Sequence, residues 1–380
     1  MTVHTRFRAV ALAALLAACA DDPARQPQVP EVPEGRDQPF RVTTVAEGLE
    51  NPWGMAFLPG GDVLVTERPG RLRVVRGGAL VREPVVGVPQ VWARGQGGLL
   101  DVALHPDFAR NRLVYLSYSK PGPRGATTAV VRGRLEGDRL TGVEQVLEAA
   151  AWSDAAVHFG SRLVFDGRGH LFVSVGDRGT RENAQRLDTH AGKILRVHDD
   201  GRVPADNPFV GRAGALPEIW AYGIRSPQGM ALHPSTGELW ESEHGPRGGD
   251  EVNVIRAGRN YGWPAITHGI DYDGSTISKE TARQGMEQPV HHWVPSIATS
   301  GLALYEGEKF PRWRGSVFVG GLAGTHLARL RVDGGRVVEQ EKLLADRNQR
   351  IRDVRVGPDG LLYVLVDASG APLLRLEPAA

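Results

Sequence analysis

Cysteine is almost absent from this 380-residue chain, which has a single one, Cys19. A disulfide framework is therefore excluded, since each bridge needs a pair. An excess of positive charge is also missing, because 45 Lys and Arg residues face 44 Asp and Glu residues. Without a basic excess there is no electrostatic footprint for a phosphate backbone. We therefore expect no nucleic-acid partner.

The apolar run near the N-terminus, Ala9–Ala18, is too short to span a bilayer. It follows Arg6 and Arg8, and this order is typical of a secretion signal. The run leads into Leu16-Ala-Ala-Cys19, which resembles a bacterial lipobox with Cys19 as the lipidated residue. A plain signal peptide followed by a chance cysteine is the alternative.

These features predict the domain organisation. Residues 1–18 are expected to be a lipoprotein-type signal peptide and residues 19–39, rich in Pro and charge, a flexible tether. Residues 40–380 would form the catalytic domain. We expect export to the periplasm, with membrane attachment only through the lipid anchor.

Glycine and proline, in contrast, are abundant, with 48 and 26 residues. Together they make up about a fifth of the chain, against ~12% in average proteins. They separate short apolar stretches that follow one pattern, in which a strand-like stretch runs into a turn and a second apolar stretch follows. Six copies begin at Met55, Val102, Leu163, Met230, Leu302 and Val354.

The repeat length suits one four-stranded sheet plus variable loops. No segment carries a sustained helical period, so the predicted fold class is all-β. Six such units predict a six-bladed β-propeller, whose radial closure protects the sheet edges. A pair of β-sandwiches is the alternative, which the regular recurrence disfavours.

Polar residues gather between the predicted strands, most densely in Trp220–Pro264. His158 precedes the third repeat and could serve as a general base, or it could be an ordinary loop histidine. Arg350 and Arg352 are two residues apart, so in a strand they share a face and suit a polycarboxylate or phosphate. A solvated strand face is the alternative for this pair.

Two familiar sites can be excluded. The run Gly95-Gln-Gly-Gly-Leu-Leu100 lacks the third glycine and the following helix of a dinucleotide-binding fingerprint. Asp271-Tyr-Asp-Gly274 is not an EF-hand, because position twelve is Ala282 rather than Glu. Gly245-Pro246 could turn carbonyls towards a cation, although Gly-Pro is most often only a turn.

Taken together, the motifs resemble the soluble PQQ-dependent sugar dehydrogenases of the glucose/sorbosone dehydrogenase family, and more closely the periplasmic aldose sugar dehydrogenases. The resemblance runs from about Val42 to Pro378. It rests on the following motifs in order: Gly95-Gln-Gly-Gly-Leu-Leu100, Ala103-Leu-His-Pro-Asp-Phe108, His158 with Gly160-Ser-Arg-Leu163, Tyr222-Gly-Ile-Arg-Ser-Pro-Gln-Gly229, Glu243-His-Gly-Pro246, Asp250-Glu-Val-Asn253, Asn260-Tyr-Gly-Trp-Pro264 and Arg350-Ile-Arg-Asp353.

The resemblance implies oxidation of an aldose at C1 to the lactone. His158 would take the proton from the anomeric hydroxyl while hydride passes from C1 of the sugar to C5 of PQQ. The electrons would then pass to a periplasmic acceptor, either a quinone or a cytochrome. The protein would be a monomer or a dimer. The implied PQQ contacts are Gln96, Arg225, Gln228, Trp293, Arg350 and Arg352.

Two calcium ions are also implied by the resemblance. One would polarise the quinone as a Lewis acid, held by the carbonyls of Gly245 and Pro246. The other would be structural, held by Glu251 and by the backbone oxygen of Tyr261.

The chain departs from the glucose-oxidising members at three places. It has Val157 directly before the histidine, Ser226 after the arginine, and Leu322-Ala-Gly324 where those members carry a lysine. These differences favour the aldose branch, with a more open and less glucose-selective site. Two other functions stay open, namely a calcium-dependent propeller hydrolase of sugar lactones and a non-catalytic, lipid-anchored binding propeller.

Overall fold

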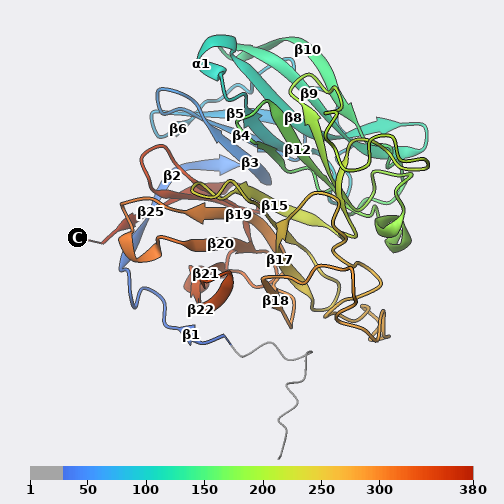
Figure 1. Cartoon of the computed structure of the whole chain (residues 1–380). Coiled ribbons are helices and arrows are strands. Elements are labelled where there is room, and N and C mark those ends of the chain that lie inside the picture. Colours follow the sequence, from blue (N-terminus) through green and yellow to red (C-terminus); the bar gives the residue numbers. More distant parts are fainter. Residues whose placement is uncertain (1–28, 380) are drawn as a thin grey trace, which may run out of the picture.

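The computed structural model describes residues 29–379, which fold into six sheets arranged around a central channel (Figure 1). Each sheet has four antiparallel strands, and one sheet has a fifth strand added in parallel. The prediction of a six-bladed, all-β propeller is confirmed.

The first three blades use consecutive strands. Blade one is β3 (Pro52–Phe57), β4 (Val63–Glu67), β5 (Arg71–Arg76) and β6 (Ala79–Leu80). Blade two is β7 (Leu99–Leu104), β8 (Leu113–Gly122), β9 (Gly125–Glu136) and β10 (Arg139–Glu148). Blade three is β11 (Leu163–Phe165), β12 (His170–Val175), β13 (Lys193–His198) and β14 (Ile219–Tyr222).

The last three blades complete the ring. Blade four is β15 (Pro227–Leu232), β16 (Leu239–Glu243), β17 (Asp250–Ile255) and β18 (His291–Trp293). Blade five is β19 (Thr299–Tyr305), β20 (Ser316–Gly321), β21 (Leu327–Asp333), β22 (Arg336–Leu343) and the added β1 (Glu31–Val32). Blade six is β23 (Ile351–Val356), β24 (Leu362–Val366), β25 (Ala371–Pro378) and β2 (Phe40–Leu49).

Helix is confined to single turns in the connections. They are α1 (Phe108–Asn111), η1 (Arg181–Gln185), η2 (Pro311–Trp313) and η3 (Ala345–Arg347). Within residues 29–379, none of the helices could cross a membrane by length and hydropathy.

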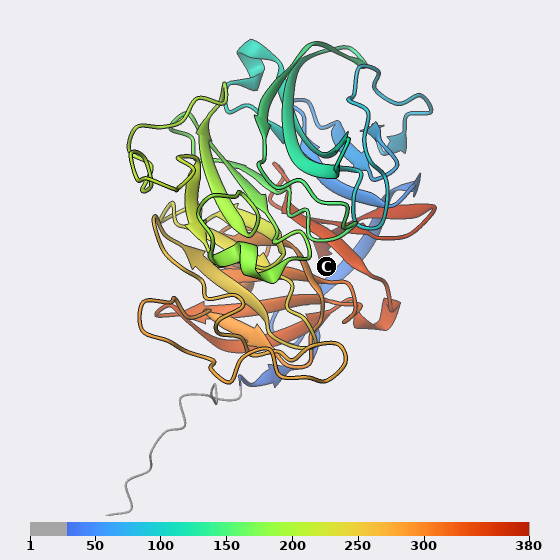
Figure 2. The ribbon, with the colours of Figure 1, turned by 90° about the vertical axis from the view of Figure 1, so that its right-hand side faces the viewer.

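Blade six joins the two ends of the described chain. Strand β2 pairs with β25 from Phe40↔Pro378 to Leu49↔Ala371, so the first long strand completes the last sheet. In both views the blue and red strands lie side by side (Figures 1 and 2). This pairing closes the ring without leaving an open edge between the first and last blades.

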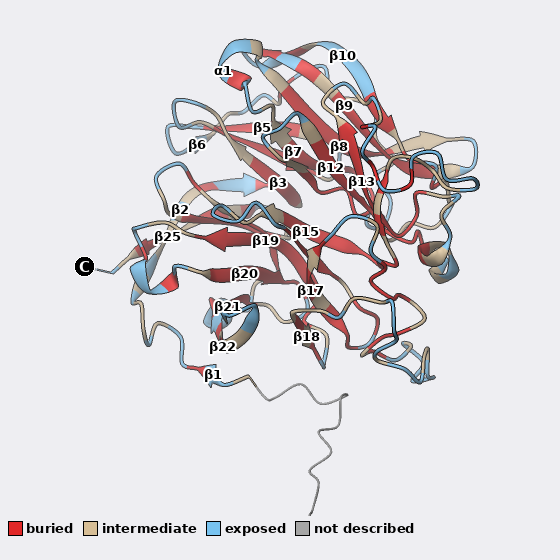
Figure 3. Cartoon of the chain, viewed as in Figure 1, coloured by how far each residue is buried: buried red, intermediate tan, exposed pale blue. Residues whose placement is uncertain are grey.

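The hydrophobic core lies between neighbouring blades (Figure 3). Strand residues alternate between two faces, and in most blades both faces are covered, so inner strands are buried along most of their length. A large cluster joins blades five, six and one around Trp313, Phe310 and Phe318.

The predicted flexible tether, residues 19–39, needs a correction at its C-terminal end. Residues 29–39 lie against blade five, where β1 pairs with β22 at Glu31↔Gln340. The backbone N–H of Gly35 donates to Glu341 Oε1 at 2.7 Å, and Glu34 accepts from the backbone of Leu344 at 2.7 Å. Cys19, the predicted signal peptide and tether residues 19–28 lie outside the described residues.

An ion network closes the middle of the channel. The buried guanidinium of Arg162 lies 3.2 Å from Asp101 and 3.0 Å from Asp353, and Arg355 bonds both carboxylates at 2.9 and 3.1 Å. Buried charges are tolerated where they are paired in this way. The network forms a floor that contacts the site above it, because Arg162 Nε donates to the carbonyl of Gln228 at 2.6 Å.

Candidate active site

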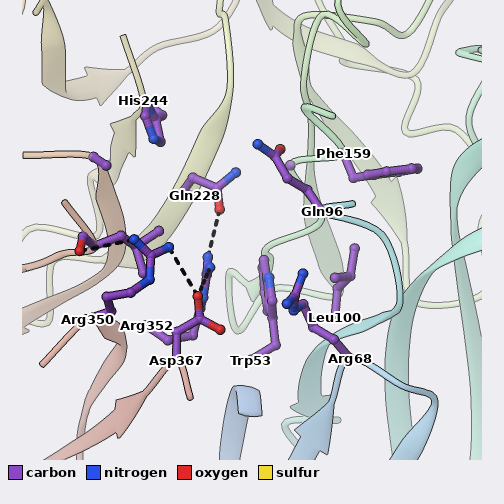
Figure 4. Close-up of a pocket in the computed structure, with 13 residues that line it drawn as sticks. Trp53, Arg68, Gln96, Leu100, Phe159, Gln228, His244, Arg350, Arg352 and Asp367 are labelled. Atoms are coloured by element: carbon purple, nitrogen blue, oxygen red, sulfur yellow. Dashed lines mark hydrogen bonds and ion pairs between the residues drawn. The ribbon is translucent and has the colours of Figure 1, made fainter. Parts of the chain in front are cut away.

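A cavity of about 240 Å³ lies at one mouth of the channel (Figure 4). All six blades contribute to it, as the predicted architecture requires. Its lining residues are Trp53, Arg68, Gln96, Leu100, Phe159, Gly160, Gln228, His244, Ala298, Leu322, Arg350, Arg352 and Asp367.

Two kinds of chain position supply this lining. Trp53, Leu100, Gln228 and Arg352 lie at the start of the innermost strands of their blades. Other lining residues follow directly after the second strands, whose ends reach the same mouth because the two strands are antiparallel. They are Arg68, His244, Leu322 and Asp367.

One wall of the cavity is cationic. Arg352 and Arg350 place guanidinium nitrogens 3.2 and 3.3 Å from Asp367 Oδ2, and Arg352 also donates to Gln228 Oε1 at 3.3 Å. Burial lowers the pKa of Arg352 to about 10. Burial also raises the pKa of Asp367, but the charges of Arg352, Arg68 and Arg350 outweigh it and leave this pKa below its ordinary value.

This wall has more donors than acceptors. The Nε atoms of Arg352 and Arg68 are buried and have no hydrogen-bond partner within residues 29–379. Arg350 and Arg352 pair with the same carboxylate, that of Asp367, and the charge of Arg68 also acts on it. Buried polar groups are normally hydrogen-bonded, so buried nitrogens without a partner indicate a missing acceptor. An anionic ligand with several carboxylates would supply the missing acceptors.

His158 lies beside the opposite wall, directly before the lining residues Phe159 and Gly160. Its backbone has φ +53°, a left-handed conformation that is costly for a residue with a side chain. Two bonds hold it there: its N–H donates to Gln96 Oε1 at 2.8 Å, and its ring Nδ1 lies 2.6 Å from Asp177 Oδ1.

Asp177 decides which imidazole nitrogen is free. It is buried, and burial raises its pKa, but hydrogen bonds from His158 and Gly179 and the charge of His158 outweigh burial and lower the pKa below its ordinary value. An ionised carboxylate accepts the proton on Nδ1, which leaves the Nε2 lone pair of His158 as a proton acceptor.

Arg225 lies behind the cavity rather than in its lining. Its Nη1 donates to the carbonyls of His244 at 2.6 Å and Gly245 at 2.7 Å, and its Nη2 donates to the hydroxyl of Tyr272 at 3.3 Å. In this structure Arg225 braces the backbone at His244 and Gly245, and its predicted contact with PQQ stays a prediction.

The same bonds bear on the predicted calcium at Gly245 and Pro246. The Gly245 carbonyl already accepts from the Arg225 guanidinium and lies 2.9 Å from His244 Nδ1. A second cation on that oxygen would face the positive charge of Arg225 at close range. The Gly245 oxygen therefore does not fit a calcium ion as it is arranged, and we derive no step through one.

Trp293, which the sequence predicts to flank the cofactor, is not among the lining residues of this cavity, and that role stays a prediction. The residue lies on β18, the outermost strand of blade four, and packs in the core shared with blade five. It contacts His291 edge to face rather than the cavity.

Glu251 belongs to a row of acidic side chains in blade four. It lies opposite Glu243 in the ladder, and the amide of Asn253 lies 3.3 to 3.5 Å from Glu251, Glu243 and Glu241. Burial raises the pKa of all three carboxyls, that of Glu243 to about 7. Glu241 Oε1 and Asn253 Oδ1 are buried without partners.

These oxygen donors suit a hard cation such as Ca²⁺. Their geometry is not a closed site, because no group of three or more His, Cys, Asp or Glu side chains in the described part of the chain converges on one metal position. Tyr261 packs in the core of blades three and four, with its hydroxyl donating to the Val254 carbonyl at 2.7 Å.

Four predicted residues, Gln96, Gln228, Arg350 and Arg352, therefore line one cavity, and His158 lies beside it. The departures also lie close by: Leu322 lines the cavity, and Ser226 accepts from the Gln228 amide at 3.1 Å. The residues missed from the sequence are Trp53, Arg68, Asp177, His244 and Asp367. Pro52-Trp-Gly-Met55 matches Pro227-Gln-Gly-Met230, a repeat signal that could have identified Trp53.

Comparison with known proteins shows the family to which the chain belongs. Residues 49–375 match the family described as Glucose / Sorbosone dehydrogenase. The chain belongs to this family. It is 48% identical to the aldose sugar dehydrogenase YliI of Escherichia coli over 343 residues, which are 89% of this chain and 92% of that protein. It is 26% identical to quinoprotein glucose dehydrogenase B of Acinetobacter calcoaceticus, covering 93% of this chain and 90% of that one.

Solved structures of family members share the fold. The apo form of the soluble E. coli aldose sugar dehydrogenase superposes with a TM-score of 0.87 at 47% identity, covering 90% of this chain and all of the other. The PQQ-bound form of an aldose sugar dehydrogenase from Streptomyces coelicolor gives a TM-score of 0.75 at 30% identity, covering 89% of this chain and 98% of the other.

Proposed function

We propose that this protein is a PQQ-dependent aldose sugar dehydrogenase that oxidises its substrate at C1 to the lactone. The observation that carries the proposal is the juxtaposition of two walls. One has arginines with unpaired buried nitrogens, and the other has a histidine whose tautomer is fixed by a buried aspartate. Family membership and the PQQ-bound relative support the same conclusion.

The residues present fit PQQ, a planar tricarboxylate. Arg352 and Arg68 would donate to its carboxylates through nitrogens that lack partners in the described part of the chain, and Arg350 would add charge from the rim. Trp53, Leu100 and Phe159 provide apolar surface in the same cavity for a flat ring system. When bound, PQQ supplies the acceptor for the hydride from sugar C1.

The protein itself would supply the proton acceptor. His158 Nε2 would take the proton of the anomeric hydroxyl, and Asp177 would stabilise the imidazolium that results. Gln96 holds the backbone of His158 from the neighbouring blade, so the base is fixed before the sugar arrives. This preorganisation is consistent with the strained backbone at His158.

The cellular context follows from the sequence and belongs to the proposal. We propose export, lipid attachment at Cys19, and electron transfer to a quinone or cytochrome of the periplasm. A structural calcium at Glu251 is also proposed, on the strength of the unpaired oxygens of Glu241 and Asn253. Calcium addition to protein treated with a chelator should then raise the melting temperature of the wild type and not that of Glu251→Gln.

The competing hydrolase function has less support. A sugar lactonase would need carboxylates converging on a central metal, whereas the one carboxylate in the cavity lining, Asp367, is committed to arginines. A non-catalytic binding propeller would not need a base held in a strained backbone conformation.

Reconstitution tests the proposal. The mature domain is mixed with PQQ and Ca²⁺ and assayed for dye reduction with a panel of aldoses, and PQQ binding is followed by absorbance and thermal shift. We expect saturable binding and turnover with several aldoses. Absence of both PQQ binding and turnover would reject the enzyme assignment.

A further inference from the structure

The buried carboxylate that orients His158 is itself held by an indole from another blade. Trp263 Nε1 donates to Asp177 Oδ2 at 2.8 Å, while Asp177 Oδ1 faces His158 Nδ1 at 2.6 Å and also accepts from the backbone of Gly179 at 2.8 Å. The two carboxylate oxygens are therefore used in opposite directions. One points to the base, and the other to the long loop between β17 and β18 of blade four.

We propose that Trp263 is a positioning residue for the reaction, acting through Asp177 on His158. This inference rests on the proposed function of His158 as the base. A carboxylate bonded through both oxygens cannot rotate about its last torsion without losing a charge-assisted hydrogen bond, so the indole fixes the plane in which Asp177 meets the imidazole.

The indole is itself firmly placed. The backbone carbonyl of Trp263 accepts from the Gln185 amide at 2.7 Å, and the backbone N–H of Trp263 donates to the carbonyl of Gly223 at 2.9 Å. Gln185 and Asn260 exchange two side-chain bonds at 2.8 and 3.0 Å across the same interface between blades three and four. The ring is 6% exposed, so the N–H bond to Asp177 is shielded from water.

Two guanidinium groups lie near the indole ring of Trp263. The carbon atoms of Arg225 and Arg181 lie 5.4 and 5.9 Å from the centre of the indole ring, within cation–π range. Arg181 is tied in turn to Asp271 at 2.7 Å on the long loop of blade four. The base is thus set by contacts from three blades: Gln96 from blade two, Asp177 from blade three and Trp263 from blade four.

The test uses Trp263→Phe, which keeps an aromatic ring and removes only the N–H donor. Trp240→Phe is the matched control, because Trp240 is 5% exposed in the same blade and its Nε1 has no hydrogen-bond partner. If Trp263→Phe does not fold, Trp263→Leu replaces it, since leucine also has no side-chain donor.

The first measurement needs no cofactor. In the free protein, the proton between His158 Nδ1 and Asp177 should give a far-downfield ¹H NMR signal, assigned by its loss in His158→Ala. We expect this signal to shift or broaden in Trp263→Phe and to stay unchanged in Trp240→Phe. An unchanged signal in Trp263→Phe overturns the proposal.

The second measurement is turnover after reconstitution with PQQ and Ca²⁺. Loss of one hydrogen bond to a charged group predicts a fall in kcat of about tenfold in Trp263→Phe, with KM within about twofold. Adding Trp263→Phe to Asp177→Asn should cause no further loss, because the indole acts only through that carboxylate. A kcat within twofold of wild type, or a full additional loss in the double variant, overturns the proposal.

Failure of the proposed function would look different. If His158→Ala turned over normally, the assignment of the base would fall. The NMR comparison would still decide whether Trp263 orders the Asp177–His158 pair.

Discussion

The two ends of the central channel are built from the same six inner strands and differ in almost every chemical respect. At one end is the 240 Å³ cavity lined by arginines, glutamines, a histidine and an aspartate. At the other is a cavity of about 420 Å³ whose lining, within residues 29–379, is apolar apart from Arg355. The network of Asp101, Arg162, Asp353 and Arg355 separates them.

The difference shows that the residues of the repeated apolar pattern and the residues of the candidate site lie at opposite ends of the channel. The apolar end is lined by Met55-Ala-Phe57, Val102-Ala-Leu104, Leu163-Val-Phe165, Met230-Ala-Leu232 and Leu302-Ala-Leu304, the starts of five sequence repeats. The polar end is lined largely by the one to four residues before these starts, where the repeats differ, including Trp53, Leu100, Phe159 and Gln228.

The largest expected effect of a substitution lies at the polar end. His158→Ala should lower kcat by about 10³-fold, because a positioned general base contributes about that much. PQQ affinity should change little, since the arginine wall is intact. Steady-state kinetics with a PQQ titration measures both, and a loss of PQQ binding equal to the loss of turnover would contradict the separation of base and binding walls.

The second prediction compares a buried arginine and an exposed arginine at the polar end. The side chain of Arg352 is 9% exposed and that of Arg350 is 49% exposed. We expect Arg352→Ala to weaken PQQ binding by about a hundredfold and Arg350→Ala by about fivefold, since buried charged hydrogen bonds contribute more than exposed pairs. Equal losses, measured by calorimetry on folded apo variants, would show that burial does not set the contribution.

Asp177→Asn should lower stability in a pH-dependent way. The pKa of Asp177 is lowered in the folded protein, so its ionised form stabilises the fold above the ordinary pKa near 4, and this contribution is lost as pH falls through the lower folded value. The variant should lose about 1–2 kcal/mol in free energy of unfolding at pH 7 and less at pH 3.5. Urea unfolding at both pH values checks this, and a loss independent of pH would contradict it.

The smallest effect on activity is expected at the apolar end. Leu232→Ala should lower the free energy of unfolding by about 1–2 kcal/mol, less than a fully buried leucine because Leu232 is partly exposed. kcat and PQQ affinity should stay within about twofold of wild type. A tenfold change in either would show that the two ends are coupled through the ion network.

The fold could be predicted from the sequence because the repeats report the apolar pattern of each blade directly. Four of the 13 lining residues could be predicted too, since Gln96, Gln228, Arg350 and Arg352 lie just before or within a repeat. Arg68, His244 and Asp367 were missed because they follow second strands, and only antiparallel pairing brings those ends back to the same mouth.

Asp177 was missed for a similar reason, since 19 residues and a hairpin separate it from His158. The contact between the two residues depends on tertiary pairing rather than on local pattern.

The pairing of β2 with β25 also determines when the site can assemble. Arg350, Arg352 and Asp367 come from the last blade, whereas Trp53 and Arg68 come from the first. These two groups become neighbours only when Phe40–Leu49 joins Ala371–Pro378. Until this pairing forms, Arg68 cannot join the arginines of the last blade, so we expect the complete cationic wall only in the closed ring.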